Sequence, residues 1–206
     1  MLLAIDTSAG TSVAVVDRDG GTLAEHSSAD PRGHAEIIGE LIRACLADSG
    51  IPVTDLSGVV AGMGPGPFTG LRVGIAAARA FAFGANKPVV PIVSHDAIAF
   101  GYDEPIIVAT DARRREVYFS VYSGADAAGL PVRTAGPALA PAGELESAVA
   151  DFGRYRLIEA REVSAASLGL LAEELYANGR SFASDEPLYL RSPDVTLSAG
   201  PKRVTG

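Results

Sequence analysis

The segment Gly62–Arg72 constrains the fold of this chain more than any other part of the sequence. It is rich in Gly and Pro, and it joins a short apolar run, Val59–Ala61, to an alanine-rich stretch. Clustered Gly and Pro between two apolar segments indicate a tight connection. The pattern therefore predicts a strand at 59–61, a close turn, and a helix at 69–83 with the hydroxyl of Thr69 as its N-cap.

The helix predicted after this turn is unusual because it is apolar almost all round. Arg72 and Arg79 are its only charged residues, and they lie seven residues apart on one face. A helix of this kind must be covered on most of its sides. Gly70, Gly74 and Ala78 form a stripe of small side chains that would let another helix approach closely. We expect another subunit to bury part of the apolar surface of this helix.

Short strands and helices alternate along the rest of the chain. Apolar runs at 2–6 and 12–16, joined by the small and hydroxyl residues Thr7–Thr11, predict a hairpin. The clearest helix is at 34–49, where apolar residues recur with the 3.6-residue period and Gly50 supplies the stop. The other predicted elements are strands at 22–28, 89–93, 106–109 and 117–122, helices from 94, near 143–150 and at 165–177, and an extended tail from Asp185.

These elements form two blocks, each with strands that lead into helices, and Gly101–Pro105 is the predicted boundary between them. Such an arrangement predicts an α/β or α+β fold with a mixed sheet. The chain has 206 residues, of which 48% are hydrophobic, so it can bury a core. Its length fits one large domain or two small ones.

The charge of the chain limits its partners. It has 17 Lys and Arg against 25 Asp and Glu, a net charge of −8, whereas nucleic-acid binding draws most of its affinity from Lys and Arg. A generic nucleic-acid binder is therefore excluded, and any contact with RNA must be local or made by a partner. The first six residues carry no basic side chain, and no uncharged apolar run approaches the roughly 18 residues that span a bilayer. We expect a cytoplasmic protein with no membrane contact.

Metal and nucleophile chemistry has few candidate residues. Cys45 is the only cysteine, and it lies in a helical apolar pattern where a thiol normally packs as a small hydrophobe. The histidines are His26, His34 and His95, and no two of them have the i, i+4 spacing of a metal-binding helix. No G-x-S-x-G elbow is present. We therefore expect no catalytic residue, no metal and no cofactor.

Two loops carry residue types that suit nucleotide phosphates. After the first strand, a carboxylate could face a cation while hydroxyls and amides face phosphate oxygens. The glycine-rich turn could offer amides before a helix, but it lacks the Lys and hydroxyl of a P-loop. A degenerate nucleotide site and a merely tight strand-to-helix connection are both consistent with these loops. The candidate nucleotide-binding residues are Asp6, Thr7, Ser8, Gly10, Gly64 and Gly66.

Arg113, Arg114 and Arg115 form the only dense basic cluster of the chain. One interpretation is a solvated turn before the strand at 117–122, and the other is a contact with RNA or with a partner protein. In so acidic a chain, this cluster is the one local place to look for an RNA contact.

Five segments together resemble the TsaB (YeaZ) family, and they follow one another in the family's order over nearly the whole chain. The resemblance implies the two-lobed fold shared by actin, sugar kinases and Hsp70 chaperones, with lobes at about 1–102 and 103–206 and late helical segments able to pack back on the first. The segments are LAIDTSAGTSVAVVD at 3–17, His34-Ala35-Glu36 at the start of the helix at 34–49, GPGPFTGLRVGIAAARAFA at 64–82, DARRREVYFSVY at 111–122 and PLYLR at 187–191.

The same resemblance implies a function. The family is the dimerisation subunit of the bacterial machinery that makes threonylcarbamoyladenosine (t6A) by modifying N6 of the adenosine 3′ to the tRNA anticodon. The catalytic relative TsaD carries a His-x-x-x-His metal motif in the corresponding helix, whereas here His34 is followed by Ile38 in the second position. The resemblance thus implies a non-catalytic scaffold that keeps the fold and has lost the metal centre. Its implied partners are TsaD, the ATPase TsaE and, when alone, a second copy, with tRNA bound only through the complex.

The pairing surface implied by the resemblance combines the apolar helix at 69–83 with the helix at 34–49, since an apolar patch with few charges is typical of stable interfaces. Two enzymatic alternatives stay open: an actin-fold kinase or ATPase that uses the loops named above, and a glycoprotease-like hydrolase. The expected interface residues are Ile38, Leu41, Ile42, Gly70, Val73, Gly74, Ala77, Ala78 and Phe81.

Overall fold

The computed structural model describes residues 1–28 and 33–191, and its first half is built on a five-stranded mixed sheet with strand order β3-β2-β1-β4-β5. β1 pairs antiparallel with β2 and parallel with β4, which in turn pairs parallel with β5. β2 pairs antiparallel with β3. The strands are β1 (Leu2–Asp6), β2 (Thr11–Asp17), β3 (Gly21–Ser28), β4 (Gly58–Gly62) and β5 (Val89–Ile92).

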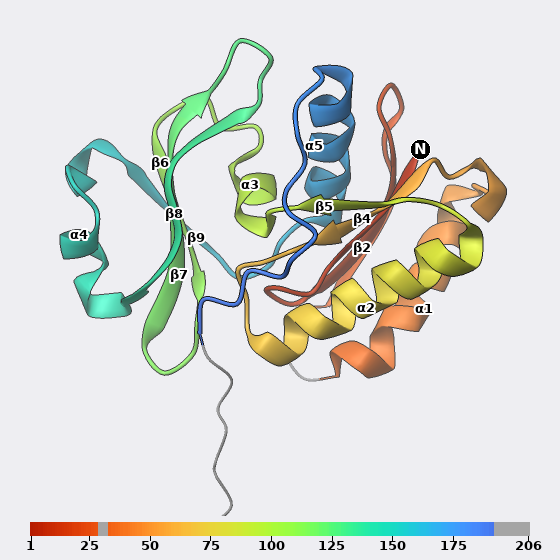
Figure 1. Cartoon of the computed structure of the whole chain (residues 1–206), viewed down its shortest axis with the longest axis horizontal. Coiled ribbons are helices and arrows are strands. Elements are labelled where there is room, and N and C mark those ends of the chain that lie inside the picture. Colours follow the sequence, from red (N-terminus) through yellow and green to blue (C-terminus); the bar gives the residue numbers. More distant parts are fainter. Residues whose placement is uncertain (29–32, 192–206) are drawn as a thin grey trace, which may run out of the picture.

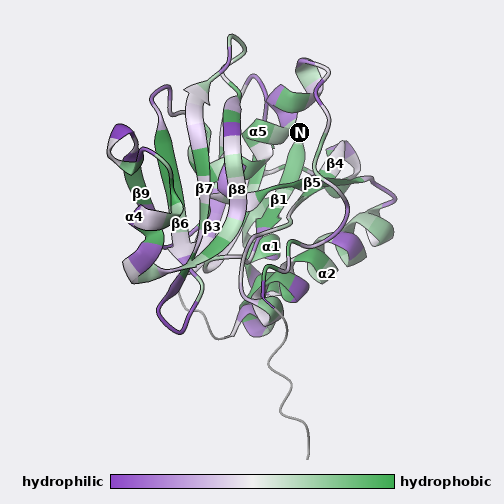
Figure 2. Ribbon diagram, turned by 60° about the vertical axis from the view of Figure 1, so that its left-hand side comes forward, coloured by the Kyte–Doolittle hydropathy of each residue, from purple (hydrophilic) through white to green (hydrophobic). Residues whose placement is uncertain are grey.

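Helices cover both faces of this first sheet. α1 (His34–Ser49) and α2 (Phe68–Ala85) lie on one face, and α5 (Ala165–Ala177) lies on the other. Alternate side chains of β1 therefore enter two different cores: Leu3 and Ile5 pack with α1 and α2, and Leu2 and Ala4 pack with α5. This explains why β1 is apolar from Leu2 to Ile5 and why β4 holds only apolar residues and glycine, which Figure 2 shows for β1.

The second sheet has four strands in the order β8-β7-β6-β9 and stands beside the first (Figure 1). α3 and α5 lie between the two sheets, and the short α4 packs on the outer side of the second. Its elements are α3 (Ser94–Ala99), β6 (Ile106–Asp111), β7 (Glu116–Ala125), β8 (Pro131–Pro141), α4 (Leu145–Ala148) and β9 (Arg156–Ala160), with 3₁₀ turns at Ala142–Glu144 and Phe152–Arg154 and another at Val53–Asp55 in the first half.

The structure confirms the helices predicted at 34–49 and 165–177 and every predicted strand, but it adds two strands that the sequence did not suggest. β8 contains three prolines and a glycine, a composition typical of a loop. β8 and β9 are the two edge strands of their sheet, where a missing backbone N–H does no harm. Among the described residues, no helix is both long and apolar enough to cross a bilayer.

Two details of the predicted helices were wrong. Thr69 does not cap α2: the helix begins at Phe68, its N-cap position is Pro67, and no side chain caps it. A proline there has no N–H to satisfy and a φ already fixed near the required value. The helix predicted near 143–150 is reduced to a 3₁₀ turn followed by the four residues of α4. The predicted tail lies outside the described residues from position 192 onward.

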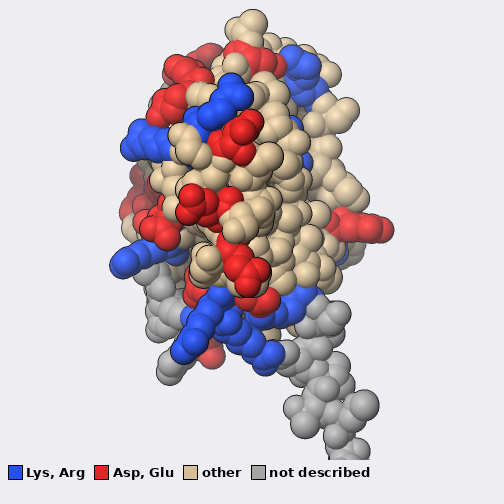
Figure 3. Space-filling view, turned by 90° about the vertical axis from the view of Figure 1, so that its left-hand side faces the viewer, with Lys and Arg blue, Asp and Glu red and all other residues tan. Residues whose placement is uncertain are grey.

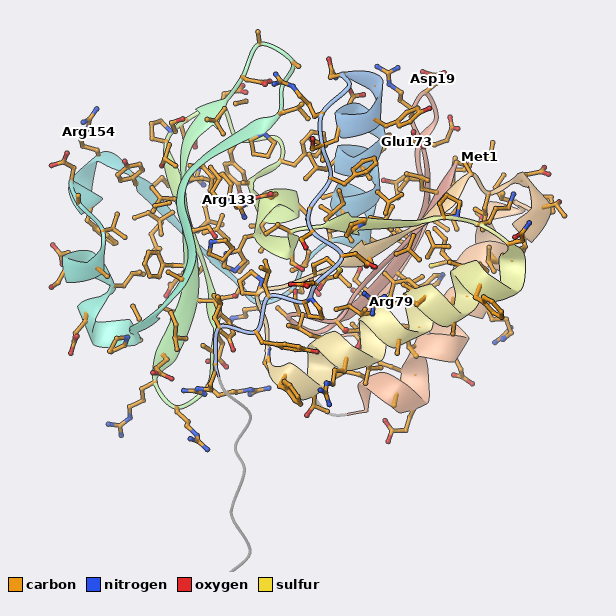
Figure 4. The ribbon with its side chains drawn as sticks, in the orientation of Figure 1. Met1, Asp19, Arg79, Arg133, Arg154 and Glu173 are labelled. Atoms are coloured by element: carbon orange, nitrogen blue, oxygen red, sulfur yellow. The ribbon has the colours of Figure 1, made fainter. Side chains whose placement is uncertain are left out.

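His95 connects α3 to the second sheet. Its Nδ1 lies 2.9 Å from Ser120 Oγ and its Nε2 lies 2.9 Å from Thr110 Oγ1, so both ring nitrogens have partners while the ring is neutral. Complete burial, assisted by the positive charge of Arg133, lowers the pKa of His95 to about 3. Arg133 of β8, labelled in Figure 4, also reaches Asp96 of α3 at 3.3 Å.

Lowering the pH should destabilise the fold through His95. Between its ordinary pKa of 6.5 and its folded pKa of about 3, the unfolded chain binds more protons at this residue than the folded chain, so stability falls as the pH falls. From neutral pH to about pH 5.5 this contribution is roughly 1 kcal/mol. Urea unfolding at both pH values should show a smaller loss for His95→Gln than for the parent chain. Equal losses would mean that His95 does not carry the effect.

A C-terminal strap, residues 182–191, follows α5 and runs back between the two sheets (Figure 1). The backbone N–H of Ala183 donates to a β5 carbonyl at 3.1 Å, and that of Leu188 donates to the carbonyl of Met63 at 2.9 Å. At its end, Arg191 Nη1 donates to the carbonyl of Ala112 at 3.0 Å, in the loop after β6. The strap therefore contacts both sheets.

Candidate functional site

A groove of about 320 Å³ lies where β1, β6 and β9 end. The loop after β1, the start of α1 and Pro67 form its wall on the side of the first sheet, and the ends of β6 and β9 form the opposite wall. Its lining residues are Thr7, Ser8, Ala9, Gly10, His34, Pro67, Asp111, Arg113, Ala160 and Arg161.

Asp6 does not line this groove, although its carboxylate was the one predicted to face a cation. It is only 1% exposed. The backbone N–H and the hydroxyl of Ser8 donate to its Oδ1 at 2.7 and 2.6 Å, and the Ser94 hydroxyl donates to its Oδ2 at 2.5 Å. Burial raises the pKa of Asp6 in spite of these hydrogen bonds. Gly62 lies so close that any β-carbon there would overlap the carboxylate. The carboxylate is thus enclosed by its own chain.

Thr7 joins the loop after β1 to α2. Its hydroxyl donates to the carbonyl of Gly70 at 2.7 Å and accepts from the N–H of Gly74 at 3.0 Å. A β-carbon at Gly70 would lie 2.7 Å from the Thr7 carbonyl oxygen. The small-residue stripe faces into the chain: the two glycines make room for Thr7, Gly70 also lies beside His34 at the start of α1, and Ala78 packs in the core between α2 and the sheet.

The glycine-rich turn packs in the same way. The Gly64 N–H donates to the Ser94 hydroxyl at 3.0 Å, and a β-carbon at Gly66 would come within 2.8 Å of the Ser8 backbone. Of the six candidate nucleotide-binding residues, Thr7, Ser8 and Gly10 line the groove, Gly66 lines the hollow beside it, and Asp6 and Gly64 line neither. The structure brings the two loops together, but most of the contacts of these residues are made within the chain.

His34 lies at the edge of the groove, and its Nδ1 is 2.6 Å from Thr11 Oγ1. Ile38, one helical turn later, is 8% exposed and packs in the core beneath α1. Within residues 1–28 and 33–191, no three His, Cys, Asp or Glu side chains lie together as metal ligands.

The exposed side of α2 is mostly apolar. Arg72 and Arg79 face the strap, where Arg72 Nε donates to the Tyr189 hydroxyl at 3.3 Å and Arg79 Nη2 pairs with Asp185 at 2.8 Å. On the opposite side, α2 packs against α1. Between them lies the outer face of α2, which consists of Ala76, Ala80 and Phe83, with the Phe83 side chain 91% exposed.

The residues expected at the pairing surface divide into two groups. Four of them, Ile38, Gly70, Gly74 and Ala78, are buried inside the chain, and the others are partly buried at the seam between α1 and α2. The outer face of α2 was not predicted, although the 100° step per residue places its three members on one arc. The sequence does not show from which directions α1 and the strap cover the helix. The partly buried residues are Leu41, Ile42, Val73, Ala77 and Phe81.

The basic cluster forms the turn between β6 and β7. Arg113, Arg114 and Arg115 are all exposed and have φ angles of 64°, 53° and 62°, a run of left-handed residues that is uncommon outside glycine. The turn separates their side chains: Arg113 lines the groove, while Arg115 lines another hollow beside Glu159. Arg161 joins Arg113 in the groove although it is distant in sequence.

Known proteins resemble this chain over most of its length. The model of a family described as TsaD, tRNA N6-adenosine threonylcarbamoyltransferase, matches residues 8–140, which is more than half of the chain. The chain belongs to that family. An uncharacterized protein of Mycobacterium tuberculosis is 41% identical to it over 202 residues, which cover 94% of this chain and 93% of that protein.

Within the TsaD family the chain is similar to TsaB and YeaZ. The tRNA threonylcarbamoyladenosine biosynthesis protein TsaB of Haemophilus influenzae is 40% identical over 125 residues, which cover 58% of this chain and 52% of that protein. A crystal structure of a protein from Pseudomonas aeruginosa, described as similar to peptidase YeaZ, superposes with a TM-score of 0.75 at 27% identity, over 92% of this chain and 99% of that one. The expected actin-like fold, two mixed sheets flanked by helices, is confirmed.

Proposed function

We propose that the chain is a non-catalytic scaffold subunit of the complex that transfers a threonylcarbamoyl group to N6 of the adenosine 3′ to the tRNA anticodon. In this proposal it pairs with a TsaD-type catalytic subunit and works with the ATPase TsaE. Membership of the TsaD family and similarity to proteins named for t6A biosynthesis support the pathway. The role within the complex is argued from the geometry of this chain.

The exposed apolar outer face of α2 is the observation that carries the proposal. Phe83 leaves almost its whole ring in solvent in the isolated chain, and Ala76 and Ala80 beside it offer no polar group. Together with the partly buried residues of the α1–α2 seam, they form a helical surface with few charges. Stable protein interfaces have apolar centres from which charged residues are depleted. We propose this surface as the site of pairing, with TsaD or, in the isolated protein, with a second copy.

The enclosed site residues favour a scaffold over an actin-fold kinase or ATPase. The hydroxyls of Ser8 and Ser94 donate hydrogen bonds to the carboxylate of Asp6. The hydroxyl of Thr7 is hydrogen-bonded to two backbone groups of α2. A cation or phosphate would have to displace these buried hydrogen bonds, each of which stabilises the fold by about 1 kcal/mol. A glycoprotease-like activity has less support, since Ile38 fills the core position that a second metal-binding histidine would need.

Mixing the purified chain with its own organism's TsaD, and measuring the mass of the product by light scattering, tests the proposal. We expect a heterodimer and, for the chain alone, a weaker homodimer. ATP turnover by the isolated chain should stay at background, while t6A formation should need both proteins, TsaE and a source of the threonylcarbamoyl group. Failure to associate with TsaD, or efficient ATP hydrolysis by the chain alone, would overturn the scaffold assignment.

A further inference from the structure

The groove continues into a second hollow of about 390 Å³ beside it, and the two share Pro67 and Arg113 in their linings. We call the pair the trough. The second hollow runs from the start of α2 to the end of the strap, past the turn between β6 and β7. Its lining residues are Gly66, Pro67, Phe68, Thr69, Ala112, Arg113, Arg114, Tyr118, Tyr189 and Arg191.

The trough concentrates positive charge in a chain whose net charge is −8. Four arginines line it, whereas Asp111 is the one acidic residue among its lining residues. Asp111 pairs with Arg113 at 3.7 Å, and Arg191 forms an ion pair with Glu116, which does not line the trough. Figure 3 shows a cluster of Lys and Arg at the lower end of one side of the molecule, whereas the other Lys and Arg of this side lie among Asp and Glu at its left edge and upper end. The charge is thus local, as an anion-binding surface on an acidic protein requires.

Aromatic rings form the other component of the trough. The rings of Phe68 and Tyr189 are 4.8 Å apart between centroids, and the Arg72 guanidinium lies 3.8 Å from the Phe68 centroid. Because Arg72 also donates to the Tyr189 hydroxyl, it holds the two rings together. Tyr189 remains 38% exposed, so part of its ring is open to a planar ligand.

The strap fixes these rings relative to the arginines. Arg191 forms an ion pair with Glu116 and donates to the Ala112 carbonyl, which ties the end of the strap to both sides of the basic turn. Tyr189, two residues earlier, is thereby held next to Arg113 and Arg114 across the second hollow. The ring and the guanidinium groups therefore belong to one preorganised surface.

We propose that the trough binds a single-stranded segment of RNA, with a base on Tyr189 and the backbone phosphates on Arg113, Arg114 and Arg161. This inference rests on the proposed function, which brings the chain next to tRNA. A stacking ring beside several cations is the combination that unpaired nucleotides select, whereas an acidic peptide would use the cations alone. Hollows of this size suit one or two splayed nucleotides, which a duplex does not offer. The turn at 113–115 thus contacts RNA with help from Arg161 and Tyr189, while Arg115 points elsewhere.

Fluorescence anisotropy with a labelled RNA stem-loop, at low salt, tests the proposal on the chain alone and on its complex with TsaD. Arg161→Glu and Tyr189→Ala should each weaken RNA binding about tenfold. Arg161→Glu should also make the slope of log affinity against log salt concentration shallower by about one. The matched controls are Arg154→Glu, an exposed arginine at the far side of the second sheet (Figure 4), and Tyr176→Ala, an exposed tyrosine of α5; both should bind like the parent.

The outcomes separate this inference from the proposed function. Arg161 lies away from the outer face of α2, so the Arg161→Glu variant should still pair with TsaD at parental affinity. If RNA affinity is unchanged in both Arg161→Glu and Tyr189→Ala, or if ATP or polyglutamate binds the trough while the stem-loop does not, the inference is overturned. Equal affinity for the stem-loop and for a fully paired duplex would also overturn it. If the trough variants lose RNA while the parent chain fails to pair with TsaD, only the scaffold assignment falls.

Discussion

Replacing Ala80 by glutamate should abolish pairing with TsaD while leaving the chain folded. Ala80 is exposed at the centre of the outer face of α2, and glutamate is a good helix former, so the isolated chain should unfold at the parental urea concentration. In the paired state the carboxylate would be buried against an apolar partner surface without a counter-charge, which costs several kcal/mol. We expect the affinity to fall by more than about 100-fold, measured by titration calorimetry or analytical ultracentrifugation.

Ala177→Glu is the matched control for this prediction, because Ala177 is also an exposed helical alanine but lies on α5. It should pair like the parent chain. Gly74→Glu cannot serve the same purpose, since Gly74 faces Thr7 inside the chain and the substitution would damage the fold itself. Co-elution of Ala80→Glu with TsaD at parental affinity would place the interface elsewhere.

The same substitution at two glycines of α2 should have opposite effects on stability. In Gly74→Ala, the new methyl group overlaps the side chain of Thr7, which is buried and holds two backbone groups of α2. Displacing Thr7 sacrifices these hydrogen bonds, and the loss exceeds the roughly 1 kcal/mol by which alanine favours a helix. A β-carbon at Gly84 would meet no neighbouring group within 4 Å, so Gly84→Ala should gain roughly 0.5 kcal/mol.

We expect Gly74→Ala to lose about 2 kcal/mol of unfolding free energy, and the two variants to differ by about 2.5 kcal/mol in urea denaturation. If Gly74→Ala is as stable as Gly84→Ala, the contact between Thr7 and α2 is not as tight as the structure indicates. The comparison also separates helix propensity from packing, because both variants change glycine to alanine in one helix.

The sequence predicted the elements whose pattern is local. α1 and α5 follow from apolar residues at helical spacing, and the hairpin of β1 and β2 follows from two apolar runs around a loop of small residues. β8 escaped prediction because Pro131, Pro137 and Pro141 are tolerated only at the edge of a sheet. Whether a segment will form an edge strand is decided by its neighbours in space.

The candidate site was predicted only in part, because some of its contacts are also made by neighbours in space that are distant in sequence. Asp6, Thr7 and Ser8 are adjacent in sequence, so their loop was found, but their partners Ser94 and the start of α2 lie far along the chain. The inward orientation of these side chains depends on such distant contacts. Nothing local placed Arg161 or Tyr189 at the site: Tyr189 was noted only as part of the family-like segment at 187–191, and the fold carries both residues to the arginine turn.

The late position of α5 in the sequence delays the formation of one of the two cores that flank the first sheet. Residues 2–92 supply all five strands, yet the helix that covers one face of them arrives only at Ala165–Ala177. A nascent chain therefore exposes Leu2, Ala4 and their neighbours on that face until the whole second sheet has been synthesised. Contacts of such long sequence separation close late and slow folding. The two sheets are separate in space, but α5, which completes the core of the first sheet, follows the whole of the second sheet in the sequence.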